Sequence, residues 1–402
     1  MLNFSFYERQ EQTNLIKLMA IHFTKEEFSI RKSKVIAELK KQNLDALLMF
    51  KQESMYWLTG YDTFGYVFFQ SLILTSKGNL ILLTRTPDLR QAQNTSIIED
   101  IRIWVDKEKS DPFNELKNIL DELNLKKSNL GVEYEAYGLT GRNAIRLNDS
   151  LKNFTTLHDK SELVSKLRLI KSNREITYIK KAAELADKAL DEVWKNAKSG
   201  ISEGKILAEM QKVIFEGGGD YPANEFIIGS GHNALLCRYQ AEKRILSNPD
   251  QLTIEWAGTY KHYHSAMFRT IPISKADPKH YKMHKACLEA LTKCEKILVP
   301  GNTVGEVFDV HAETFDDLGY KKSRMNACGY SLGATFSPNW MDVPPMIFAD
   351  NPLILKPGMV FFMHMILMDS ENQLAMNLGE TYLIIEKGNE RLGKKKLDLI
   401  VL

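Results

Sequence analysis

Hydrophobic residues in the first part of the chain alternate between helix-like and strand-like spacing. A charged amphipathic stretch over 25–42 comes first. Strand-like apolar runs then follow at 46–50, 66–74, 79–84, 101–105 and 131–137. Strands that alternate with helical stretches are typical of an α/β layer. No glycine-rich phosphate loop follows any of these runs, so the pattern disfavours a nucleotide site.

A capping box marks the start of a second domain. In Ser172-Asn173-Arg174-Glu175 the serine is suited to cap a helix start, and the glutamate is suited to reach back to the cap amide. Apolar residues then recur every three or four positions over 176–193, which predicts one long amphipathic helix. A second helix is expected from Ser202 to the glycines at 217–219. We therefore predict domains over 1–168 and 169–402.

The second domain changes to strand-like spacing after its first helices. Runs over 252–257 and 263–273 are separated by a short stretch containing Gly258, which predicts a hairpin with its turn there. Helices are expected over 279–298 and 304–318, and strands over 360–367 and 380–386. Helices combined with an antiparallel sheet predict an α+β domain.

Composition and charge exclude several classes of protein. The 402 residues are more than a single core usually holds, and 44% hydrophobic and 26% charged residues are typical of a globular protein. A net charge of +2 gives no reason to expect nucleic acid or an acidic membrane surface. The four cysteines form no C-x-x-C pair, which favours free thiols in a reducing compartment. With no signal peptide or membrane span in the sequence, we expect a cytoplasmic protein.

Chemically capable residues concentrate in a few short segments of the second domain. They are Gly231-His232-Asn233 with Arg238 and Tyr239, Glu255-Trp256-Ala257-Gly258 with Tyr263 and His264, Gly329-Tyr330-Ser331-Leu332-Gly333 with Trp340, and Met363-His364 with Gly379-Glu380. Their order, together with 169–176 and 356–360, resembles the pita-bread superfamily of creatinase, Xaa-Pro peptidases and methionine aminopeptidase. The resemblance implies an α/β creatinase/prolidase N-terminal-like domain followed by an α+β pita-bread catalytic domain.

The metal positions of that superfamily are altered in this chain. Its metallopeptidases hold two divalent metals with two aspartates, a histidine and two glutamates. The resemblance assigns these positions to Glu255, Ala266, Tyr330, His364 and Glu380. Because a two-metal site needs several carboxylates, this set implies an enzyme without metal or other cofactor. A single metal held by Glu255, His364 and Glu380 is the alternative.

The metal-free members of the superfamily suggest an activity. Creatinase lacks the metals and, by this resemblance, has a proton-transferring histidine at the position of His232. The motifs around Glu255, Tyr330 and Trp340 also resemble the ectoine hydrolase family. That resemblance implies a hydrolase that opens the cyclic amidine ring of the osmolyte ectoine to N-acetyl-2,4-diaminobutyrate.

Roles follow for the remaining candidates, because ectoine carries an amidinium ring and a carboxylate. The expected catalytic residues are His232, Glu255, His364 and Glu380. The expected substrate-binding residues are Tyr56, Arg238, Tyr239, Tyr263, His264, Tyr330 and Trp340. Aromatic faces suit the cationic ring, and arginine or tyrosine donors suit the carboxylate. Tyr263 and His264 are consecutive on a strand, so at most one of them faces the pocket.

Three other readings compete with this one. A creatinase-like amidinohydrolase is the nearest, followed by a metal-dependent Xaa-Pro peptidase and by a binding scaffold without catalysis. The expected partner is a small molecule, with neither nucleic acid nor membrane. Resemblance to homodimeric relatives also implies a homodimer in which segment 55–64 of one subunit borders the active site of the other.

Overall fold

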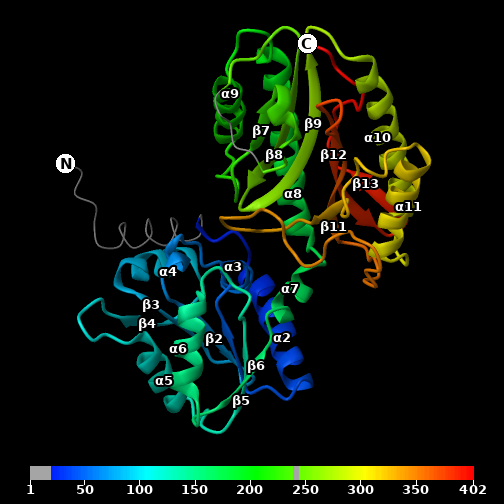
Figure 1. The fold of residues 1–402 in the computed structure, drawn as a ribbon. Coiled ribbons are helices and arrows are strands. Elements are labelled where there is room, and N and C mark those ends of the chain that lie inside the picture. Colours follow the sequence, from blue (N-terminus) through cyan, green and yellow to red (C-terminus); the bar gives the residue numbers. More distant parts are fainter. Residues whose placement is uncertain (1–19, 239–243) are drawn as a thin grey trace, which may run out of the picture. The chain divides into compact units, whose positions relative to one another are not determined.

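The computed structural model describes residues 20–238 and 244–402. The chain divides into two compact units, Met1–Arg168 and Leu169–Leu402. The first unit is drawn in blue to blue-green and the second in green to red (Figure 1).

Unit 1 is an α/β layer, as the sequence predicts. Its helices are α2 (Lys25–Lys41), α3 (Gln52–Thr59), α4 (Leu89–Thr95), α5 (Pro112–Glu122), α6 (Gly141–Leu151) and α7 (Leu163–Arg168). Its strands are β1 (Ala46–Met49), β2 (Ser71–Thr75), β3 (Leu80–Arg85), β4 (Asp100–Trp104), β5 (Asn129–Val132) and β6 (Thr156–Asp159). They form one six-stranded mixed sheet in the order β4-β3-β2-β1-β5-β6.

Both faces of this sheet are covered by helices, because its central strands are apolar on both sides. In β1, Ala46 and Leu48 belong to one hydrophobic cluster, which also contains residues of α5 and α6. Leu47 and Met49 belong to a second cluster, which contains residues of α2 and α7. Successive side chains of a strand point to opposite faces, so a continuous apolar run such as β1 requires two helical layers.

Unit 2 combines helices with an antiparallel sheet and so confirms the α+β expectation. Its helices are α8 (Asn173–Asn196), α9 (Glu203–Glu216), α10 (Pro278–Ile297) and α11 (Val304–Asp317). Its strands are β7 (Ile227–Ser230), β8 (Asp250–Tyr260), β9 (Tyr263–Ile273), β10 (Gly329–Ser331), β11 (Val360–Asp369), β12 (Leu374–Ile385) and β13 (Gly388–Arg391). The sheet runs β10-β11-β12-β9-β8-β7, with β13 paired to β12.

The predicted caps of the first two helices are present in unit 2. Ser172 accepts from the amide of Glu175, whose carboxylate accepts from the amide of Ser172, so the capping box is complete. Ser202 caps α9 in the same way through the amide of Lys205. The left-handed residue after α9 is Gly218, with φ of 79°.

The β8–β9 hairpin is present, but the prediction of its turn at Gly258 is wrong. The turn is Lys261-His262, whose φ angles of 52° and 62° are those of a two-residue type I′ turn. Gly258 lies inside β8 instead, where a Cβ atom would come within 2.0 Å of the Ala182 carbonyl oxygen in α8. The glycine therefore serves close helix–sheet packing.

Two predicted strands also have different limits. The 66–74 run begins with a short 3₁₀ helix over Gly65–Val67, and β2 starts only at Ser71. The last long strand starts at Leu374 rather than at 380, and its residues 374–383 pair with β11.

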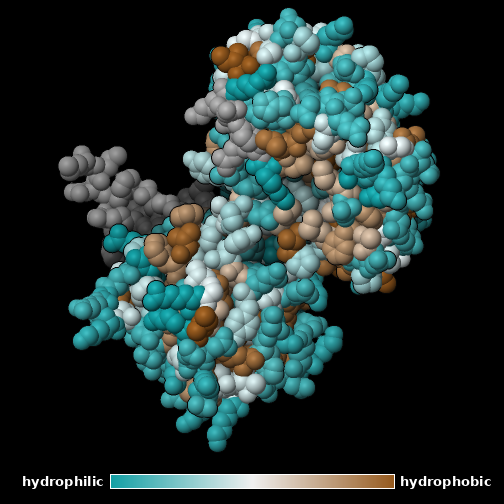
Figure 2. All heavy atoms as spheres, in the orientation of Figure 1, coloured by the Kyte–Doolittle hydropathy of each residue, from teal (hydrophilic) through white to brown (hydrophobic). Residues whose placement is uncertain are grey.

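The visible face of each unit is mainly hydrophilic, with hydrophobic residues in separate patches (Figure 2). Within the described part of the chain, no helix has the length and apolar character needed to cross a membrane.

Candidate active site

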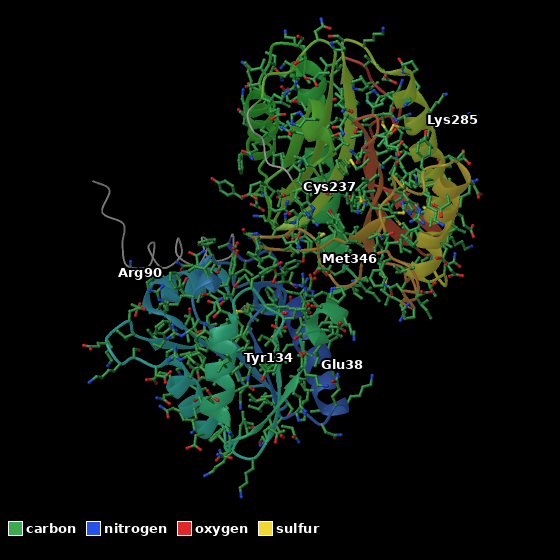
Figure 3. All side chains as sticks on the ribbon, viewed as in Figure 1. Glu38, Arg90, Tyr134, Cys237, Lys285 and Met346 are labelled. Carbon is green, nitrogen blue, oxygen red and sulfur yellow. The ribbon has the colours of Figure 1, made fainter. Side chains whose placement is uncertain are left out.

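A cavity of about 190 Å³ opens into unit 2. Its lining residues are Asn224, Ile227, Cys237, Arg238, Glu255, Phe268, Met325, Ala327, Tyr330, Asn339, Trp340, Met341, Met346, His364 and Ile366. Figure 3 labels Cys237 and Met346, which reach it from two segments far apart in the sequence. Sites for drug-sized ligands usually measure roughly 300–1,000 Å³, so this cavity suits a smaller molecule.

The floor of the cavity is a row of four paired residues that crosses the sheet. Glu255 in β8 is opposite Phe268 in β9. Phe268 is in turn opposite Gly379 in β12, and Gly379 is opposite His364 in β11. Directly paired residues point to the same face of a sheet. The two titratable side chains therefore lie at the ends of one row, with Phe268 and Gly379 between them.

Glu255 ends a short chain of hydrogen bonds inside the cavity. The Tyr330 hydroxyl donates to Oε1 of Glu255 at 3.0 Å, and the indole nitrogen of Trp340 donates to the Tyr330 hydroxyl at 2.8 Å. Burial raises the pKa of Glu255 to about 7, against the opposing effects of the Tyr330 hydrogen bond and the Arg238 charge. A carboxyl group with a pKa near neutrality can both accept and release a proton at physiological pH.

His364 supplies a second titratable group. Burial lowers the pKa of His364 to about 4, so the imidazole is neutral at pH 7. Its Nδ1 atom is buried and has no hydrogen-bond partner in the part of the chain that the structure describes. An unsatisfied buried polar atom costs about 1–3 kcal/mol, so a ligand or water that pairs with it in the cavity would be stabilised.

The remaining walls differ in character. The exposed side chain of Arg238 supplies a positive charge, and no hydrogen bond or ion pair ties it to another residue in the described parts of the chain. Met325, Met341 and Met346 supply an apolar, deformable surface. The half-buried thiol of Cys237 also faces the cavity, and burial followed by the charge of Glu255 raises the pKa of this thiol.

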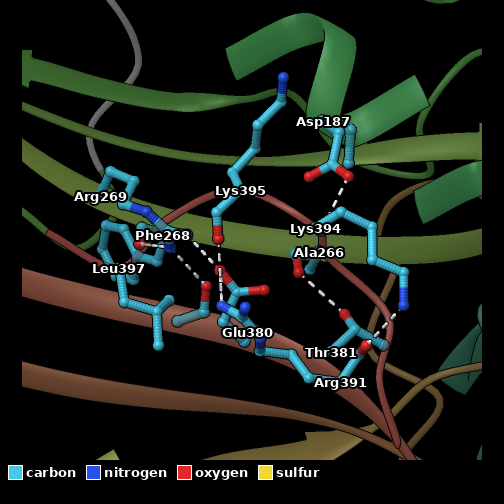
Figure 4. Close-up of polar contacts among 12 residues, drawn as sticks. Asp187, Ala266, Phe268, Arg269, Glu380, Thr381, Arg391, Lys394, Lys395 and Leu397 are labelled. Atoms are coloured by element: carbon cyan, nitrogen blue, oxygen red, sulfur yellow. Dashed lines mark hydrogen bonds and ion pairs between the residues drawn. The ribbon is translucent and has the colours of Figure 1, made fainter. Parts of the chain in front are cut away.

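Glu380 does not reach this cavity, contrary to its predicted catalytic role. It is opposite Met363, one position along from the Gly379–His364 pair, so its side chain points to the other face of the sheet. There it is fully buried and paired with Arg269 (Figure 4). Burial raises the pKa of Glu380, and the Arg269 charge opposes that shift.

His232 also lies outside the cavity. It is in a short 3₁₀ helix, Gly231–Leu235, its side chain is exposed, and it is not one of the lining residues. The cavity residues of this segment are Cys237 and Arg238, at the other end of the motif. A proton-transfer role for His232 therefore has no support in the geometry.

Tyr263 and His264 are structural residues rather than cavity residues. The Tyr263 hydroxyl donates to Glu175 of the capping box at 2.7 Å. The Nε2 atom of His264 accepts from the amide of Ala223, and Nδ1 is bonded to the Thr335 hydroxyl. Burial lowers the pKa of His264 to about 3, so it is a neutral, fixed ring.

The two other predicted substrate contacts lie elsewhere. Tyr56 is buried in unit 1, where its hydroxyl is 2.7 Å from Nδ1 of His22, so its ring is not available to a ligand. Tyr239 falls outside the described residues.

The residues of the cavity do not fit the metal site of the superfamily. Of the five positions assigned by resemblance, Glu255 and His364 are the only metal-ligating types that face the cavity. The cavity-facing residue of β12 is Gly379, and Ala266 has no donor atom. Among residues 20–238 and 244–402, no three His, Cys, Asp or Glu side chains are grouped closely enough to hold a metal ion. Two ligands are fewer than the three or more that catalytic metal sites use.

Several cavity residues were not foreseen from the sequence, among them Cys237, Phe268 and the three methionines. Phe268 could have been predicted, because a two-residue turn at Lys261-His262 pairs Phe268 with Glu255 across the hairpin. The methionines lie in irregular segments, where no periodicity assigns a face. Asn224 has a supporting role, since its side-chain oxygen accepts from the backbone amide of Trp340 at 3.0 Å.

Comparison with known proteins places this site in a family. The model of the creatinase/prolidase N-terminal domain matches residues 31–170, and that of metallopeptidase family M24 matches residues 177–386. The ectoine hydrolase of Halomonas elongata is 25% identical over 95% of this chain and 99% of its own. An Xaa-Pro dipeptidase of Pyrococcus horikoshii is 25% identical over 91% of this chain and 97% of its own.

Solved structures give the same fold. The crystal structure of a recombinant prolidase from Thermococcus sibiricus matches with a TM-score of 0.84 and 22% identity, covering 93% of this chain and 99% of that one. The pita-bread fold expected for unit 2 is thereby confirmed. Since the M24 model covers more than half of the residues, the chain belongs to metallopeptidase family M24, a family of hydrolases, with a creatinase/prolidase N-terminal domain ahead of it.

Proposed function

We propose that this protein is a metal-independent hydrolase that opens the cyclic amidine ring of ectoine to N-acetyl-2,4-diaminobutyrate. The observation that carries the proposal is the buried carboxyl group of Glu255, held by Tyr330 in a cavity that it shares with Arg238, Trp340 and His364. The similarity to the Halomonas elongata ectoine hydrolase over nearly the whole chain supports the same activity.

The cavity matches the three chemical parts of this substrate. The Glu255 carboxylate suits the amidinium group, and the indole of Trp340 suits the face of a cationic ring. Arg238 suits the substrate carboxylate through charge-assisted hydrogen bonds. The methionine side chains suit the methyl group on the amidine carbon. A volume of about 190 Å³ also favours a single small ring over a peptide.

The proposed reaction adds one water molecule across a carbon–nitrogen bond. Glu255 accepts a proton from the water, whose oxygen bonds to the amidine carbon to give a tetrahedral intermediate. Glu255 then gives this proton to the ring nitrogen, the bond between that nitrogen and the amidine carbon breaks, and the acetamide product forms. His364, neutral at pH 7, lies at the other end of the row and is suited to bind the hydroxyl group of the intermediate. Direct attack by Glu255 would instead give an acyl-type adduct on its carboxylate.

A second candidate is an amidinohydrolase that acts on an open-chain guanidinium compound such as creatine. The same carboxylate and aromatic face support it, since a guanidinium is also a planar cation. Xaa-Pro dipeptidase activity is a weaker candidate, although such enzymes match the chain at similar identity, because the donor set does not fit their metals.

The test is an assay of the purified, extensively chelated protein with ectoine, creatine and an Xaa-Pro dipeptide, followed by NMR of the products. We expect an N-acetyl-diaminobutyrate from ectoine, at a rate that added divalent cations do not change. Activity that appears only with a divalent cation, or on the dipeptide alone, would contradict the proposal. The NMR spectrum also assigns which ring nitrogen is released.

We further propose that the protein is a cytoplasmic homodimer. Phe64 is 70% exposed in unit 1, which leaves an aromatic side chain of the 55–64 segment available to a partner subunit. Tyr56 and Trp57 are buried within their own unit and cannot have this role.

A further inference from the structure

We propose that Arg269 and Glu380 are positioning residues that hold Glu255 and His364 in register from the opposite face of the sheet. The inference rests on the proposed function, in which those two cavity residues act on the substrate. Neither Arg269 nor Glu380 lines the cavity. Their effect is therefore indirect, through the backbone of the strands between the two reacting groups.

The β8–β9 pair and the β11–β12 pair meet at a short junction between β9 and β12, which we call the β9–β12 seam. Strands β9 and β12 share only two paired positions, Arg269 with Leu378 and Phe268 with Gly379. The other two pairs of the row belong to longer ladders. Glu255 with Phe268 is part of the β8–β9 ladder, and Gly379 with His364 is part of the β11–β12 ladder. Side-chain hydrogen bonds from Thr381 to Ala266 and between Asn377 and Thr270 also join β9 and β12, so this junction depends on side chains more than the two ladders do.

Arg269 spans this seam with its guanidinium group. Its Nη1 atom donates to the carbonyl oxygens of Phe268 and Gly379, both at 2.8 Å. These two residues are the central pair of the row whose ends are Glu255 and His364. A planar guanidinium can bind two oxygens while also pairing with a carboxylate, which an ammonium group does with far less geometric precision.

Glu380 holds the guanidinium in place. Its Oε1 atom is hydrogen-bonded to Nη2 of Arg269, and Glu380 has no exposed surface. Arg391 at the end of β13 lies 3.9 Å from the same oxygen and donates to the carbonyl oxygen of Lys395 (Figure 4). A Cβ atom on Gly393 would come within 2.3 Å of Oε2, so the C-terminal segment packs directly on this carboxylate.

The buried pair is more costly than a surface pair, because both charges lose their hydration. The presence of the Arg269–Glu380 pair beside the β9–β12 junction is explained if the pair fixes the geometry of the row. A shift of about 1 Å between reacting groups is enough to lower turnover by about a hundredfold. Loss of the Arg269–Glu380 pair is therefore expected to reduce kcat more than it raises KM.

The experiment compares Arg269→Lys and Glu380→Gln with the wild type in three measurements. We expect kcat for ectoine to fall about 10- to 100-fold with KM changed less than about threefold. We expect the acid limb of the pH–rate profile to move, since it reports the surroundings of Glu255. The third measurement is the rate at which the Cys237 thiol reacts with a disulfide reagent, which we expect to rise several-fold. The other three cysteines are buried, so this rate reports the cavity alone.

The matched control is Glu390→Gln, which removes the surface pair between Glu390 and Lys180 next to Arg391. It should leave all three measurements at wild-type values. If Arg269→Lys does not fold, Glu380→Gln and the milder Arg391→Gln test the inference instead. We expect both to change the three measurements in the same direction as described for Arg269→Lys. Folded variants with wild-type kcat, pH profile and thiol reactivity would overturn the inference. If the wild type fails to hydrolyse ectoine, the proposed function is wrong. The reaction rate of the Cys237 thiol then tests by itself whether the Arg269–Glu380 pair shapes the cavity.

Discussion

The hydroxyl group of Tyr330 lies 3.0 Å from the Oε1 atom of Glu255 and holds it within the cavity. Because the indole of Trp340 donates to the same hydroxyl, the only proton that Tyr330 can offer points towards Glu255. The hydrogen bond stabilises the carboxylate form, whereas burial disfavours it. The balance leaves Glu255 titrating close to neutral pH.

Replacement of Glu255 by glutamine separates a catalytic role from simple charge balance. If the carboxylate activates water or attacks the substrate, kcat for ectoine should fall at least about a hundredfold, the usual scale for loss of a general base. We expect this outcome, since no other carboxylate of residues 20–238 and 244–402 lines the cavity. Near-normal kcat with a raised KM would show that the residue only binds the cation. Mass spectrometry of a quenched reaction tests for an adduct on Glu255.

Removal of the Tyr330 hydroxyl should change the pH dependence of the reaction. Its hydrogen bond lowers the pKa of Glu255, so Tyr330→Phe should raise that pKa. The rate increases with pH as the base ionises, and the acid limb of kcat/KM should therefore move to higher pH. Trp340→Phe is the control, because it keeps the Tyr330–Glu255 bond and should move the limb much less. A profile for Tyr330→Phe that coincides with the wild type contradicts the assignment of this limb to Glu255.

Glu255 should also make stability depend on pH. Its pKa is raised from 4.5 to about 7 in the folded state, so the folded protein binds more protons than the unfolded chain between these values. Stability is therefore lost as the pH rises through this window. Glu255→Gln should be more stable than the wild type at pH 8, by up to about 3 kcal/mol at 1.36 kcal/mol per pKa unit, and equally stable below pH ~4. Urea unfolding at several pH values measures the difference, which should not be constant with pH.

His232→Ala should leave turnover nearly unchanged, because the exposed imidazole lies outside the cavity. Arg238→Ala, six positions further along the same segment, should instead raise KM at least about tenfold through loss of a charge-assisted hydrogen bond to the substrate carboxylate. Steady-state kinetics of the two variants side by side give a direct comparison. A large loss of kcat in His232→Ala would restore the proton-transfer role that the sequence suggested.

The proposed dimer predicts a specific effect of Phe64. If this exposed ring borders the active site of a partner subunit, Phe64→Ala should raise KM several-fold while light scattering still finds a dimer. Phe68→Ala is a suitable comparison, because Phe68 is also about half exposed but is covered by the guanidinium of Arg85. A fully active wild-type monomer would falsify the proposal.

The elements of the fold were predictable from local signals. The capping box at Ser172, the apolar period of α8 and the strand texture of β8 and β9 all act over a few residues, and sequence patterns express them directly. The predicted position of the hairpin turn is wrong because a glycine such as Gly258 is typical of a turn. The glycine at position 258 is instead needed because α8 packs closely against β8 there, and no local sequence pattern reveals this long-range contact.

The site was predictable only in part. The motifs placed Glu255, Tyr330, Trp340 and His364 in one cavity, but Glu380 was assigned to the wrong face. Two adjacent residues on a strand point in opposite directions, so an error of one position in carrying a motif over changes the face completely. The catalytic role of His232 rests on the resemblance to creatinase, whereas the cavity receives Arg238 from the same segment.

Gly379 bears on how this protein can change over evolution. A Cβ atom at this position would come within 2.7 Å of the Phe362 ring and 2.9 Å of the Cβ atom of Phe268. A carboxylate side chain could therefore fit there only if these aromatic neighbours moved or became smaller. Substitution of glycine by aspartate or glutamate alone would lower stability before any metal ligand was gained. Placing a third metal-ligating side chain in this row from β12 thus requires several simultaneous changes in the cavity.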